Sequence, residues 1–365
     1  MKGEKKPHMT KPMPSLFTTT VLEWYSAHGR SLPWRETKDP YAIWLSEVIL
    51  QQTRIVQGTD YWHRFMQAYP TVEHLARASE DEVLRLWQGL GYYSRARHLH
   101  EAARQIMARG GTFPRTVSEL RELSGVGEYT ASAIASFAFN VPVPTIDGNV
   151  YRVLSRYFGI STPVNSTEGK REFAQLAREL SEVVSVKGEE VSSVSTYNQA
   201  MMDFGALQCT PQNASCQSCP LMLTCEAFRT RRVASLPVKT RRAGVKTRRL
   251  TYIIIRCNGQ TAIHQRGPGD IWQGLWEPFL CDIDRLPFPL TAAHSLRLVA
   301  KDVKHVLTHR LLLADCYLLQ SATRPPLPAD YVWINEEDIG QYAIPRLVEI
   351  LIEKAKTKDL LTDES

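Results

Sequence analysis

No stretch of the sequence approaches the ~18 consecutive apolar residues that a membrane-spanning helix needs. The first 17 residues contain lysines but no continuous apolar segment of the kind that secretion signals carry. Cysteine is also scarce, because none of the seven occurs in the first 208 residues, whereas an extracellular disulfide framework would distribute pairs along the chain. These absences predict a soluble, intracellular protein in a reducing compartment, without contact to a membrane.

Acidic residues are missing from residues 229–249, which hold nine basic residues and show little apolar periodicity. We interpret this segment as a linker, either a solvated tether or a contact to the backbone of a polyanion. Before it, residues 16–228 carry apolar side chains three and four positions apart, which indicates an all-helical domain after a tail of residues 1–15. After it, residues 250–356 contain short β-branched runs closed by turn residues and then one helical run, which indicates a smaller α+β domain.

Positive charge is in mild excess, because 44 lysines and arginines face 38 aspartates and glutamates, for a net charge of +6. Such a balance favours an acidic partner such as nucleic acid. Many soluble enzymes are equally basic, so the partner has to be inferred from motifs.

A glycine turn interrupts the helical pattern of residues 122–137, ELSGVGEYTASAIASF. Gly125 and Gly127 flank Val126, and glycine permits backbone angles that are closed to other residues. The bare amides of such a turn, at the start of a helix, can bind a phosphate because unpaired N–H groups and the helix dipole both favour an anion. The alternative is a tight turn that only connects two packed helices.

Four of the seven cysteines are crowded into 17 residues, with the spacing C-x6-C-x2-C-x5-C at Cys209, Cys216, Cys219 and Cys225. Four thiolates at such spacing can bind one [4Fe–4S] cluster or one zinc ion. Zinc sites usually have two short pairs with a longer gap, so the single compact run favours the cluster.

Together these motifs resemble a known family. The glycine turn is similar to the helix-hairpin-helix of DNA repair proteins, and the cysteine spacing matches the iron–sulfur loop of the endonuclease III and MutY branch of DNA glycosylases. With the segment LSEVILQQT around Glu47, the chain resembles MutY-type adenine DNA glycosylases over nearly its whole length. This resemblance implies several domains: an all-α helix-hairpin-helix glycosylase domain, with the hairpin near residues 115–139 and a [4Fe–4S] loop at 209–225, followed by a smaller α+β Nudix-like domain.

Two carboxyl groups are the candidates for catalysis. Glu47 lies among apolar residues between positions 43 and 50, so on a buried helix its carboxyl would be desolvated and its pKa raised, as a general acid requires. Adenine is a poor leaving group until a ring nitrogen is protonated, and the sugar cation that remains needs an ionised carboxylate beside it. The resemblance implies that Glu47 is the acid, that Asp147 is this carboxylate and that Asn149 orients the site. The segment IDGNVYRV also fits an alternative in which Asp147 is a helix N-cap.

Tyr129 follows the glycine turn at the position where bifunctional members of the superfamily carry a lysine, whose amine attacks the sugar and leads to strand cleavage. The resemblance therefore implies base removal without efficient lyase activity. We expect the Tyr129 hydroxyl to lie near Asp147.

Other site residues follow from the resemblance alone. A flipped base leaves a gap in the duplex that a side chain must fill. Gln51 and Gln52 follow Glu47 by one helical turn, and the resemblance assigns the wedge to Gln52 and Tyr92.

The adenine pocket is assigned in the same way. The segment SLPWRETKDPYAIW contains Trp34 and Arg35, and in relatives this segment lines the pocket with the arginine near the base. Gln199 matches a carboxylate or amide position near the edge of the adenine.

The C-terminal segment resembles the opening of a Nudix domain without its glutamate-rich, magnesium-binding helix, which is missing after Glu277. In the MutY family this domain recognises 8-oxoguanine through a Phe-Ser-His loop. The corresponding residues here are Leu307, Thr308 and His309. Leucine loses an aromatic face, whereas threonine keeps the hydroxyl.

We therefore predict a monofunctional glycosylase that removes adenine mispaired with 8-oxoguanine or guanine in double-stranded DNA, acting as a monomer in a bacterial-type cytoplasm, near the nucleoid. Two alternatives remain. One is a bifunctional glycosylase/lyase for oxidised pyrimidines, which Tyr129 and the extra domain disfavour. The other is a catalytically silent DNA-binding or redox-sensing protein, which the presence of both Glu47 and Asp147 disfavours.

Overall fold

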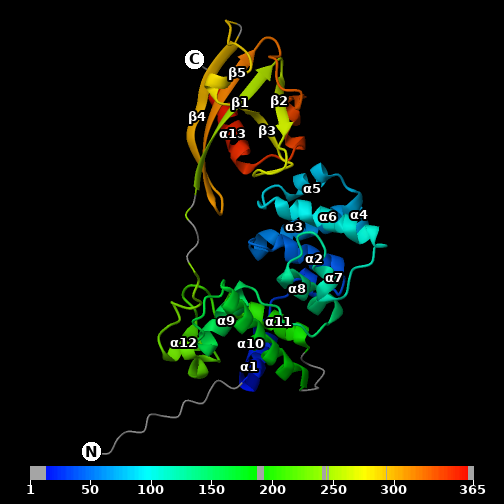
Figure 1. Ribbon diagram of the computed structural model, residues 1–365, viewed down its shortest axis with the longest axis vertical. Helices are drawn as coiled ribbons and strands as arrows, with labels where there is room; N and C mark the ends of the chain where they lie inside the picture. The colour runs from blue at the N-terminus through cyan, green and yellow to red at the C-terminus, as the bar shows by residue number, and fades with distance from the viewer. Residues whose placement is uncertain (1–13, 187–192, 241–243, 245, 293, 361–365) are drawn as a thin grey trace, which may run out of the picture. The chain divides into compact units, whose positions relative to one another are not determined.

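The computed structural model of the protein describes residues 14–186, 193–240, 244, 246–292 and 294–360. The chain forms two compact units, each built from two separate segments (Figure 1). The first unit comprises residues 1–52 and 109–241, and the second comprises residues 53–108 and 242–365.

The first unit is helical in its described residues. Its longer helices are α1 (Pro14–His28), α2 (Pro40–Ile49), α8 (Glu128–Phe139), α9 (Gly148–Phe158), α10 (Thr167–Val186) and α11 (Val194–Asp203). Its short elements are η1 (Pro33–Arg35), α7 (Val117–Leu120), η2 (Phe204–Gln208), η3 (Cys216–Ser218), η4 (Met222–Thr224) and α12 (Glu226–Arg229).

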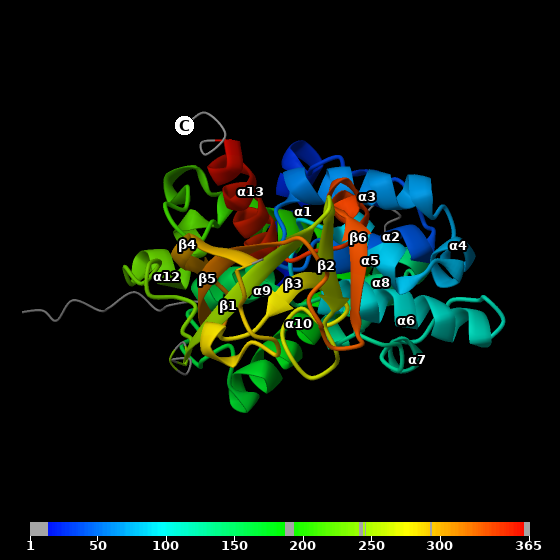
Figure 2. The ribbon, with the colours of Figure 1, turned by 90° about the horizontal axis from the view of Figure 1, so that it is seen from above.

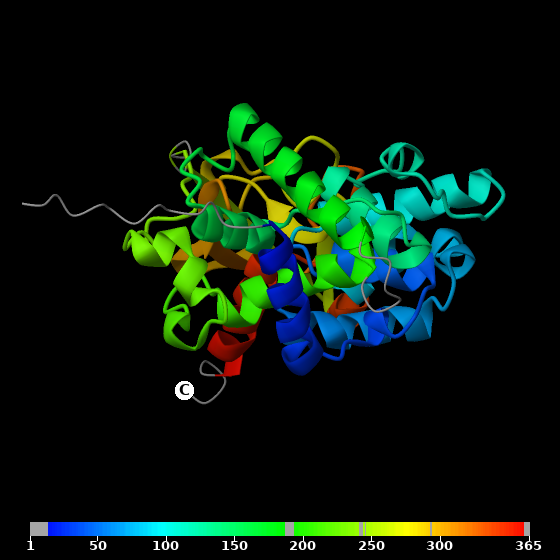
Figure 3. The same cartoon turned by 90° about the horizontal axis from the view of Figure 1, so that it is seen from below.

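Two packing contacts of the first unit position the candidate site. Helix α1 packs against α10 and α11, as Figure 3 shows, and this core contains buried aromatic residues such as Phe17, Phe173 and Phe204. Helix α2 packs separately against α8, where Ile43 meets Phe137. The helix that carries Glu47 is therefore packed directly on the helix that follows the glycine turn.

The second unit begins with four helices: α3 (Ile55–Ala68), α4 (Val72–Arg77), α5 (Glu80–Trp87) and α6 (Ser94–Ala108). Helix α5 starts at a capping box, in which the Ser79 hydroxyl accepts from the Glu82 amide and the Glu82 carboxylate accepts from the Ser79 amide. Helix α6 packs against α4 and α5.

The rest of the second unit is a six-stranded mixed sheet in the order β4-β5-β1-β3-β2-β6 (Figure 2). Its elements are β1 (Lys246–Cys257), β2 (Gln260–Gln265), β3 (Trp276–Leu280), η5 (Ile283–Arg285), β4 (His294–Val306), β5 (Arg310–Ser321), β6 (Tyr331–Asn335), η6 (Glu336–Gln341) and α13 (Arg346–Leu360). Strands β1 and β5 are parallel, and the other paired strands are antiparallel.

Helix α13 covers one face of this sheet, where Leu347 and Leu351 pack against Leu312 and Leu318. Between β3 and β4, the described residues form only the short turn η5, so no helix occupies the place of the glutamate-rich Nudix helix. This arrangement agrees with the predicted loss of the metal-binding helix.

The expected linker at residues 229–249 differs from the structure at both ends. Leu236 is buried in the first unit, and the Val238 carbonyl accepts from the Val164 amide at 3.0 Å. Strand β1 already begins at Lys246, which pairs with Arg310. The charge-rich composition did not predict the Val238 hydrogen bond or the pairing of β1 with β5. Both contacts are made by backbone groups, which can form hydrogen bonds whatever side chains they carry.

Within the described part of the chain, no helix combines the length and the apolar character required to span a bilayer.

A buried ion pair ties β2 to β3 in the sheet. Arg266 Nη1 donates to Glu277 Oε1 at 2.7 Å, and the Tyr252 hydroxyl donates to Glu277 Oε2 at 2.9 Å. The side chains of Arg266 and Glu277 are only 6% and 1% exposed. Removing one partner would leave a buried charge without compensation, which costs far more than the loss of a surface pair.

We expect the Arg266→Met substitution to lower the free energy of unfolding by about 3–5 kcal/mol. Urea unfolding of the full chain, followed by tryptophan fluorescence, measures this change. The matched control is Arg346→Met. Arg346 forms an ion pair with Glu349, but its side chain is 59% exposed, and exposed pairs contribute about 1 kcal/mol or less. Equal losses in the two variants would contradict the role given to the buried pair.

Candidate active site

Glu47, Tyr129 and Asp147 come together in the first unit. Glu47 on α2 is half-buried, and the Tyr129 hydroxyl on α8 donates a hydrogen bond to its carboxyl group. Burial raises the pKa of Glu47 to about 7, helped by the negative charge of Asp147 and opposed by the Tyr129 hydrogen bond and the charge of Arg35. The carboxyl can therefore hold a proton near neutral pH, as the apolar sequence around it predicts.

Asp147 is the N-cap of α9. Its Oδ1 accepts from the amides of Asn149 and Val150 at 2.8 Å each, and its Oδ2 accepts from Asn149 Nδ2 at 2.6 Å. The pKa of Asp147 is raised above its ordinary value, because burial outweighs the lowering effect of these hydrogen bonds. Asp147 therefore caps α9 and also lies close enough to Glu47 for its charge to act on that carboxyl group. The N-cap alternative for the IDGNVYRV segment does not exclude a place in the candidate site.

Asn149 connects Asp147 to the cysteine loop through Arg152. Arg152 Nη2 donates to Asn149 Oδ1 at 2.7 Å, and Arg152 Nε donates to the Cys209 carbonyl at 2.7 Å. One turn later, Arg156 Nη1 lies 3.4 Å from Cys209 Sγ and donates to the Thr210 carbonyl at 2.7 Å. A continuous set of hydrogen bonds thus runs from the candidate carboxylate to the first cysteine.

Asp203 is a site residue that sequence reasoning missed. Its side chain is fully buried and accepts from Arg35 Nη1 and Nη2 at 2.9 Å each, as well as from the backbone amide and guanidinium of Arg30. Burial alone would raise the pKa of Asp203, but the hydrogen bonds and charges of Arg35 and Arg30 lower it to about 2. An aspartate inside the apolar run of α11, four residues after Gln199, is the signal that could have found it.

The glycine turn is formed as predicted at one glycine only. Gly125 has a φ of +72°, in the left-handed region. Gly127 has a φ of −82° and a ψ of 179°, an extended conformation open to any residue, so only Gly125 uses the conformational freedom that glycine permits. Gly127 is the N-cap of α8 and has no side chain to cap it, and a Cβ built there would meet no atom within 4 Å. Val126 is buried beneath the turn.

The predicted wedge residues both have strained backbones. Gln52, just after α2, has a φ of +59°, and Tyr92, before α6, has a φ of +48°. Both side chains are exposed. Non-glycine residues rarely adopt this conformation, and when they do they are often at functional sites. Gln51 differs, because its amide is partly buried and donates to Thr130 at 3.4 Å.

The predicted pocket residues lie in the first unit. Trp34 in η1 is buried, and Arg35 follows it with its guanidinium held by Asp203. Gln199 on α11 accepts from the Tyr25 hydroxyl at 3.1 Å.

Leu307, Thr308 and His309 form the turn between β4 and β5 in the second unit. Leu307 packs against the core beneath α13, whereas Thr308 and His309 are exposed. In the same unit, the Tyr92 hydroxyl lies 2.7 Å from Thr308 Oγ1.

The four cysteines of the 209–225 loop are partly buried and interact electrostatically. Burial raises the pKa of the Cys219 thiol to about 12, and the neighbouring Cys209, Cys225 and Cys216 add to the effect. Among the described residues, no three Cys, His, Asp or Glu side chains are arranged as ligands of a single metal ion. Four neighbouring thiols that become thiolates require a compensating cation, so this donor set fits an iron–sulfur cluster.

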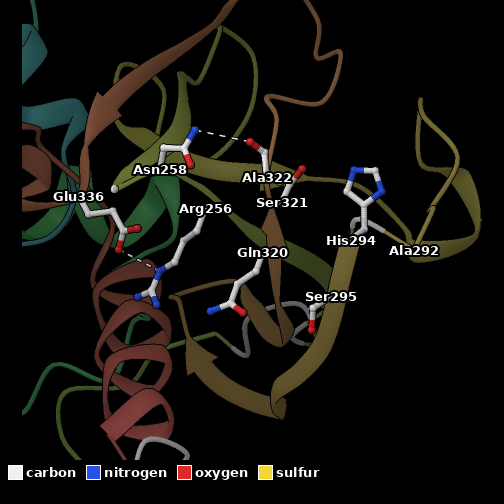
Figure 4. Close-up of a pocket in the computed structure, with 10 residues that line it drawn as sticks. Arg256, Asn258, Ala292, His294, Ser295, Gln320, Ser321, Ala322 and Glu336 are labelled. Carbon is white, nitrogen blue, oxygen red and sulfur yellow. Dashed lines mark hydrogen bonds and ion pairs between the residues drawn. The ribbon is translucent and has the colours of Figure 1, made fainter.

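A polar hollow of about 500 Å³ lies elsewhere, at one end of the sheet (Figure 4). Arg256 and Glu336 form an ion pair at 2.9 Å on its wall, next to Gln320 and Ser295. None of the predicted site residues lines this hollow.

Comparison with known proteins identifies the family of the two parts of the chain. Residues 45–180 match the model of the HhH-GPD superfamily base excision DNA repair proteins, and residues 251–354 match the NUDIX domain model. The adenine DNA glycosylase of Buchnera aphidicola from Schizaphis graminum is 34% identical over 263 residues, which cover 72% of this chain and 74% of that protein. The chain belongs to the adenine DNA glycosylase family.

The mammalian members of the family are longer. The adenine DNA glycosylase of Mus musculus is 42% identical over 222 residues, which cover 58% of this chain. The chain spans about 42% of the mouse protein's length.

Solved structures support the fold of the helical part. A thermostable thymine-DNA glycosylase has 29% identity and a TM-score of 0.54, covering 60% of this chain and 97% of that chain. A trapped endonuclease III–DNA covalent intermediate has 22% identity and a TM-score of 0.50, covering 61% of this chain and 99% of that one. The predicted helix-hairpin-helix glycosylase domain, followed by a Nudix-like domain, is therefore confirmed.

The raised pKa of Glu47 predicts how stability depends on pH. Because the folded pKa of about 7 exceeds the ordinary 4.5, the stability that Glu47 contributes is fully present below pH 4.5 and is lost as the pH rises through 7. Relative to Glu47→Gln, we expect the wild-type chain to lose about 2–3 kcal/mol of unfolding free energy between pH 4.5 and 7.5, with little further change above. Urea unfolding at several pH values measures the difference. Parallel pH curves for the two proteins would contradict the raised pKa.

Proposed function

We propose that this chain is a monofunctional DNA glycosylase that hydrolyses the N-glycosidic bond of adenine mispaired with 8-oxoguanine or guanine. The observation that carries the proposal is the pair of carboxyl groups on α2 and α9: Glu47, with a pKa raised to about 7, and Asp147, held by three hydrogen bonds. Family membership supports the same activity.

In this mechanism the protonated Glu47 donates to a ring nitrogen of the flipped adenine. The glycosidic electron pair leaves with the base, and the sugar acquires the character of an oxocarbenium ion. Asp147 faces this cation as a carboxylate. Burial raises the pKa of Asp147, and its hydrogen bonds to Asn149 and Val150 oppose that rise and favour the ionised form. Two neighbouring carboxyl groups resist simultaneous ionisation, so the negative charge on Asp147 helps to keep the proton on Glu47.

Tyr129 determines which reaction follows. Its phenol hydrogen-bonds to Glu47 and cannot form a Schiff base with the sugar, as a lysine amine could. Water adds to the sugar cation and gives up a proton to the now ionised Glu47, and the resulting abasic strand is left uncut.

DNA binding uses groups outside this pair. The bare amides of the turn Gly125–Gly127 bind a backbone phosphate without reading sequence. Gln52 and Tyr92 each fill space in the duplex when the adenine is everted, and the left-handed backbone of each projects its exposed side chain. The everted adenine and its surroundings are contacted by four further residues: Trp34, Arg35, Gln51 and Gln199.

Recognition of the opposite base belongs to the turn at Leu307, Thr308 and His309. The exposed Thr308 hydroxyl can hydrogen-bond to the oxidised ring, and its contact with Tyr92 supports a shared task. Leu307 packs inward and therefore supports the turn rather than stacking on a base.

Cys209, Cys216, Cys219 and Cys225 would hold a [4Fe–4S] cluster. When bound, such a cluster supplies a cationic centre that crosslinks the loop and can exchange electrons. Arg152 and Arg156 bind the carbonyls of this loop, so a rigid loop also fixes Asn149.

The activity is tested with a duplex that contains a single adenine opposite 8-oxoguanine. We expect strand breaks only after treatment with alkali, because the product is an intact abasic strand. Glu47→Gln should lower the single-turnover rate by about 100-fold or more while DNA affinity stays nearly unchanged. The control is Glu23→Gln, at an exposed carboxyl of α1, which should keep wild-type activity.

Other outcomes would identify the alternatives. Breaks without alkali would indicate a glycosylase/lyase. No breaks at all would indicate a silent DNA-binding or redox-sensing protein, and full activity of Glu47→Gln would exclude Glu47 as the acid.

The cluster is tested by metal analysis of the protein purified without oxygen. We expect about four iron atoms and no stoichiometric zinc, with visible absorbance that Cys219→Ser abolishes. Cys281→Ser is the control, because Cys281 lies outside the loop and its thiol bonds to the backbone carbonyls of Asp282 and Arg285. One zinc ion per chain in place of iron would contradict the cluster.

A further inference from the structure

Tyr25 on α1 connects two of the residues assigned to the adenine pocket. Its hydroxyl donates to Gln199 Oε1 at 3.1 Å, and Arg35 Nη1 lies 3.5 Å from the hydroxyl oxygen of Tyr25. The Arg35 guanidinium also lies 5.9 Å from the centre of the Tyr25 ring. These three side chains come from α1, η1 and α11, which all belong to the first unit.

The direction of the hydrogen bonds follows from chemistry. A guanidinium can only donate, so the Tyr25 oxygen accepts from Arg35 and the phenol hydrogen is free to go to Gln199. A hydrogen bond received from Tyr25 requires an acceptor, and the carbonyl oxygen is the only acceptor of a glutamine amide. The opposite end of the amide, Nε2 with its two N–H groups, then faces away from Tyr25.

This arrangement is anchored at both ends. Arg35 donates two hydrogen bonds to the buried Asp203, which lies one helical turn after Gln199 on α11. The Tyr25 ring is packed against Gly29, where a Cβ would come within 2.7 Å of the ring carbon Cε2. Neither Arg35 nor the Tyr25 ring can therefore turn away without breaking other contacts.

The arrangement also reaches the catalytic acid, because the charge of Arg35 acts on the Glu47 carboxyl. Because Arg35 and Tyr25 order the Gln199 side chain, they also fix its position relative to Glu47, the group that protonates the base. A free glutamine amide could present either end to a substrate, whereas a fixed one distinguishes acceptors from donors on the edge of a base.

We propose that Tyr25 is a positioning residue that holds the Gln199 amide with its Nε2 donors toward the everted base, so that Gln199 binds an unprotonated ring nitrogen of adenine. The inference rests on the proposed function. It adds to that function the residue that determines whether Gln199 presents a hydrogen-bond donor or an acceptor to the adenine. Tyr25 itself does not touch the base.

The first test is a double-mutant cycle on the A:8-oxoguanine duplex under single-turnover conditions. Tyr25→Phe removes only the hydroxyl, and we expect it to lower the rate of base removal about 2- to 10-fold, as the loss of one hydrogen bond implies, without changing the affinity for DNA. In the Gln199→Leu background, the same substitution should have no further effect.

The control for this cycle lies on the same helix. Tyr197 is buried on α11, two residues before Gln199, and its hydroxyl has no hydrogen-bond partner in the described structure. Tyr197→Phe should therefore keep the wild-type rate. Thermal unfolding of each variant reports any loss of folding separately from the loss of rate.

The second test concerns the end of the amide that faces the base. Gln199→Glu has the same shape but replaces the Nε2 donors by an acceptor. We expect it to lose at least as much activity as Gln199→Leu. Wild-type activity of Gln199→Glu would overturn the proposed orientation.

The remaining outcomes separate this inference from the function on which it rests. A wild-type protein that removes no adenine would overturn the proposed function, and this inference with it. An active wild type whose Tyr25→Phe variant behaves like Tyr197→Phe, or loses the same factor in the Gln199→Leu background, would overturn the role of Tyr25 alone.

Discussion

Burial of the Glu47 carboxyl beside a second carboxyl group is the constraint on which the candidate site depends. Water would keep Glu47 ionised at neutral pH, and only desolvation together with the charge of Asp147 raises its pKa to about 7. The packing of α2 on α8 produces this desolvation, and it also brings Tyr129 to the carboxyl. A helix contact that stabilises the fold therefore prepares the acid.

The positive side of the site is organised by another buried carboxylate. Asp203 binds Arg30 and Arg35 at once, and its lowered pKa keeps it ionised through the neutral range. A fully buried charge is costly unless it is paired and hydrogen-bonded, and here every contact of the carboxylate also fixes an arginine. The guanidinium of Arg35 is thereby placed where its charge acts on Glu47 without neutralising it as a direct ion pair would.

Asp147 is stabilised from the opposite direction, through the cysteine loop. Asn149, Arg152 and the Cys209 carbonyl form one set of hydrogen bonds, so the loop 209–225 and the start of α9 share their geometry. This connection gives the cysteine loop a structural consequence at the site. In the second unit, Glu277 has an analogous role, because it binds Arg266 and Tyr252 inside the sheet.

The sequence by itself determined the features that depend on neighbours along the chain. Apolar residues around Glu47 predicted its desolvation, the IDGN segment predicted the cap at Asp147, and the cysteine spacing predicted a shared loop. These succeed because helix periodicity, capping and loop closure are local. The helical and α+β parts, and the missing Nudix helix, followed from the same local patterns.

Only the tertiary structure decided the contacts that join distant segments. Asp203 meets Arg30 and Arg35 across 173 and 168 positions, and Tyr25 meets Gln199 across 174. No periodicity encodes such pairs, since they depend on how α1 packs against α11. The extended backbone of Gly127 and the early start of β1 at Lys246 have the same origin, because backbone angles and strand pairing respond to partners that the local sequence does not contain.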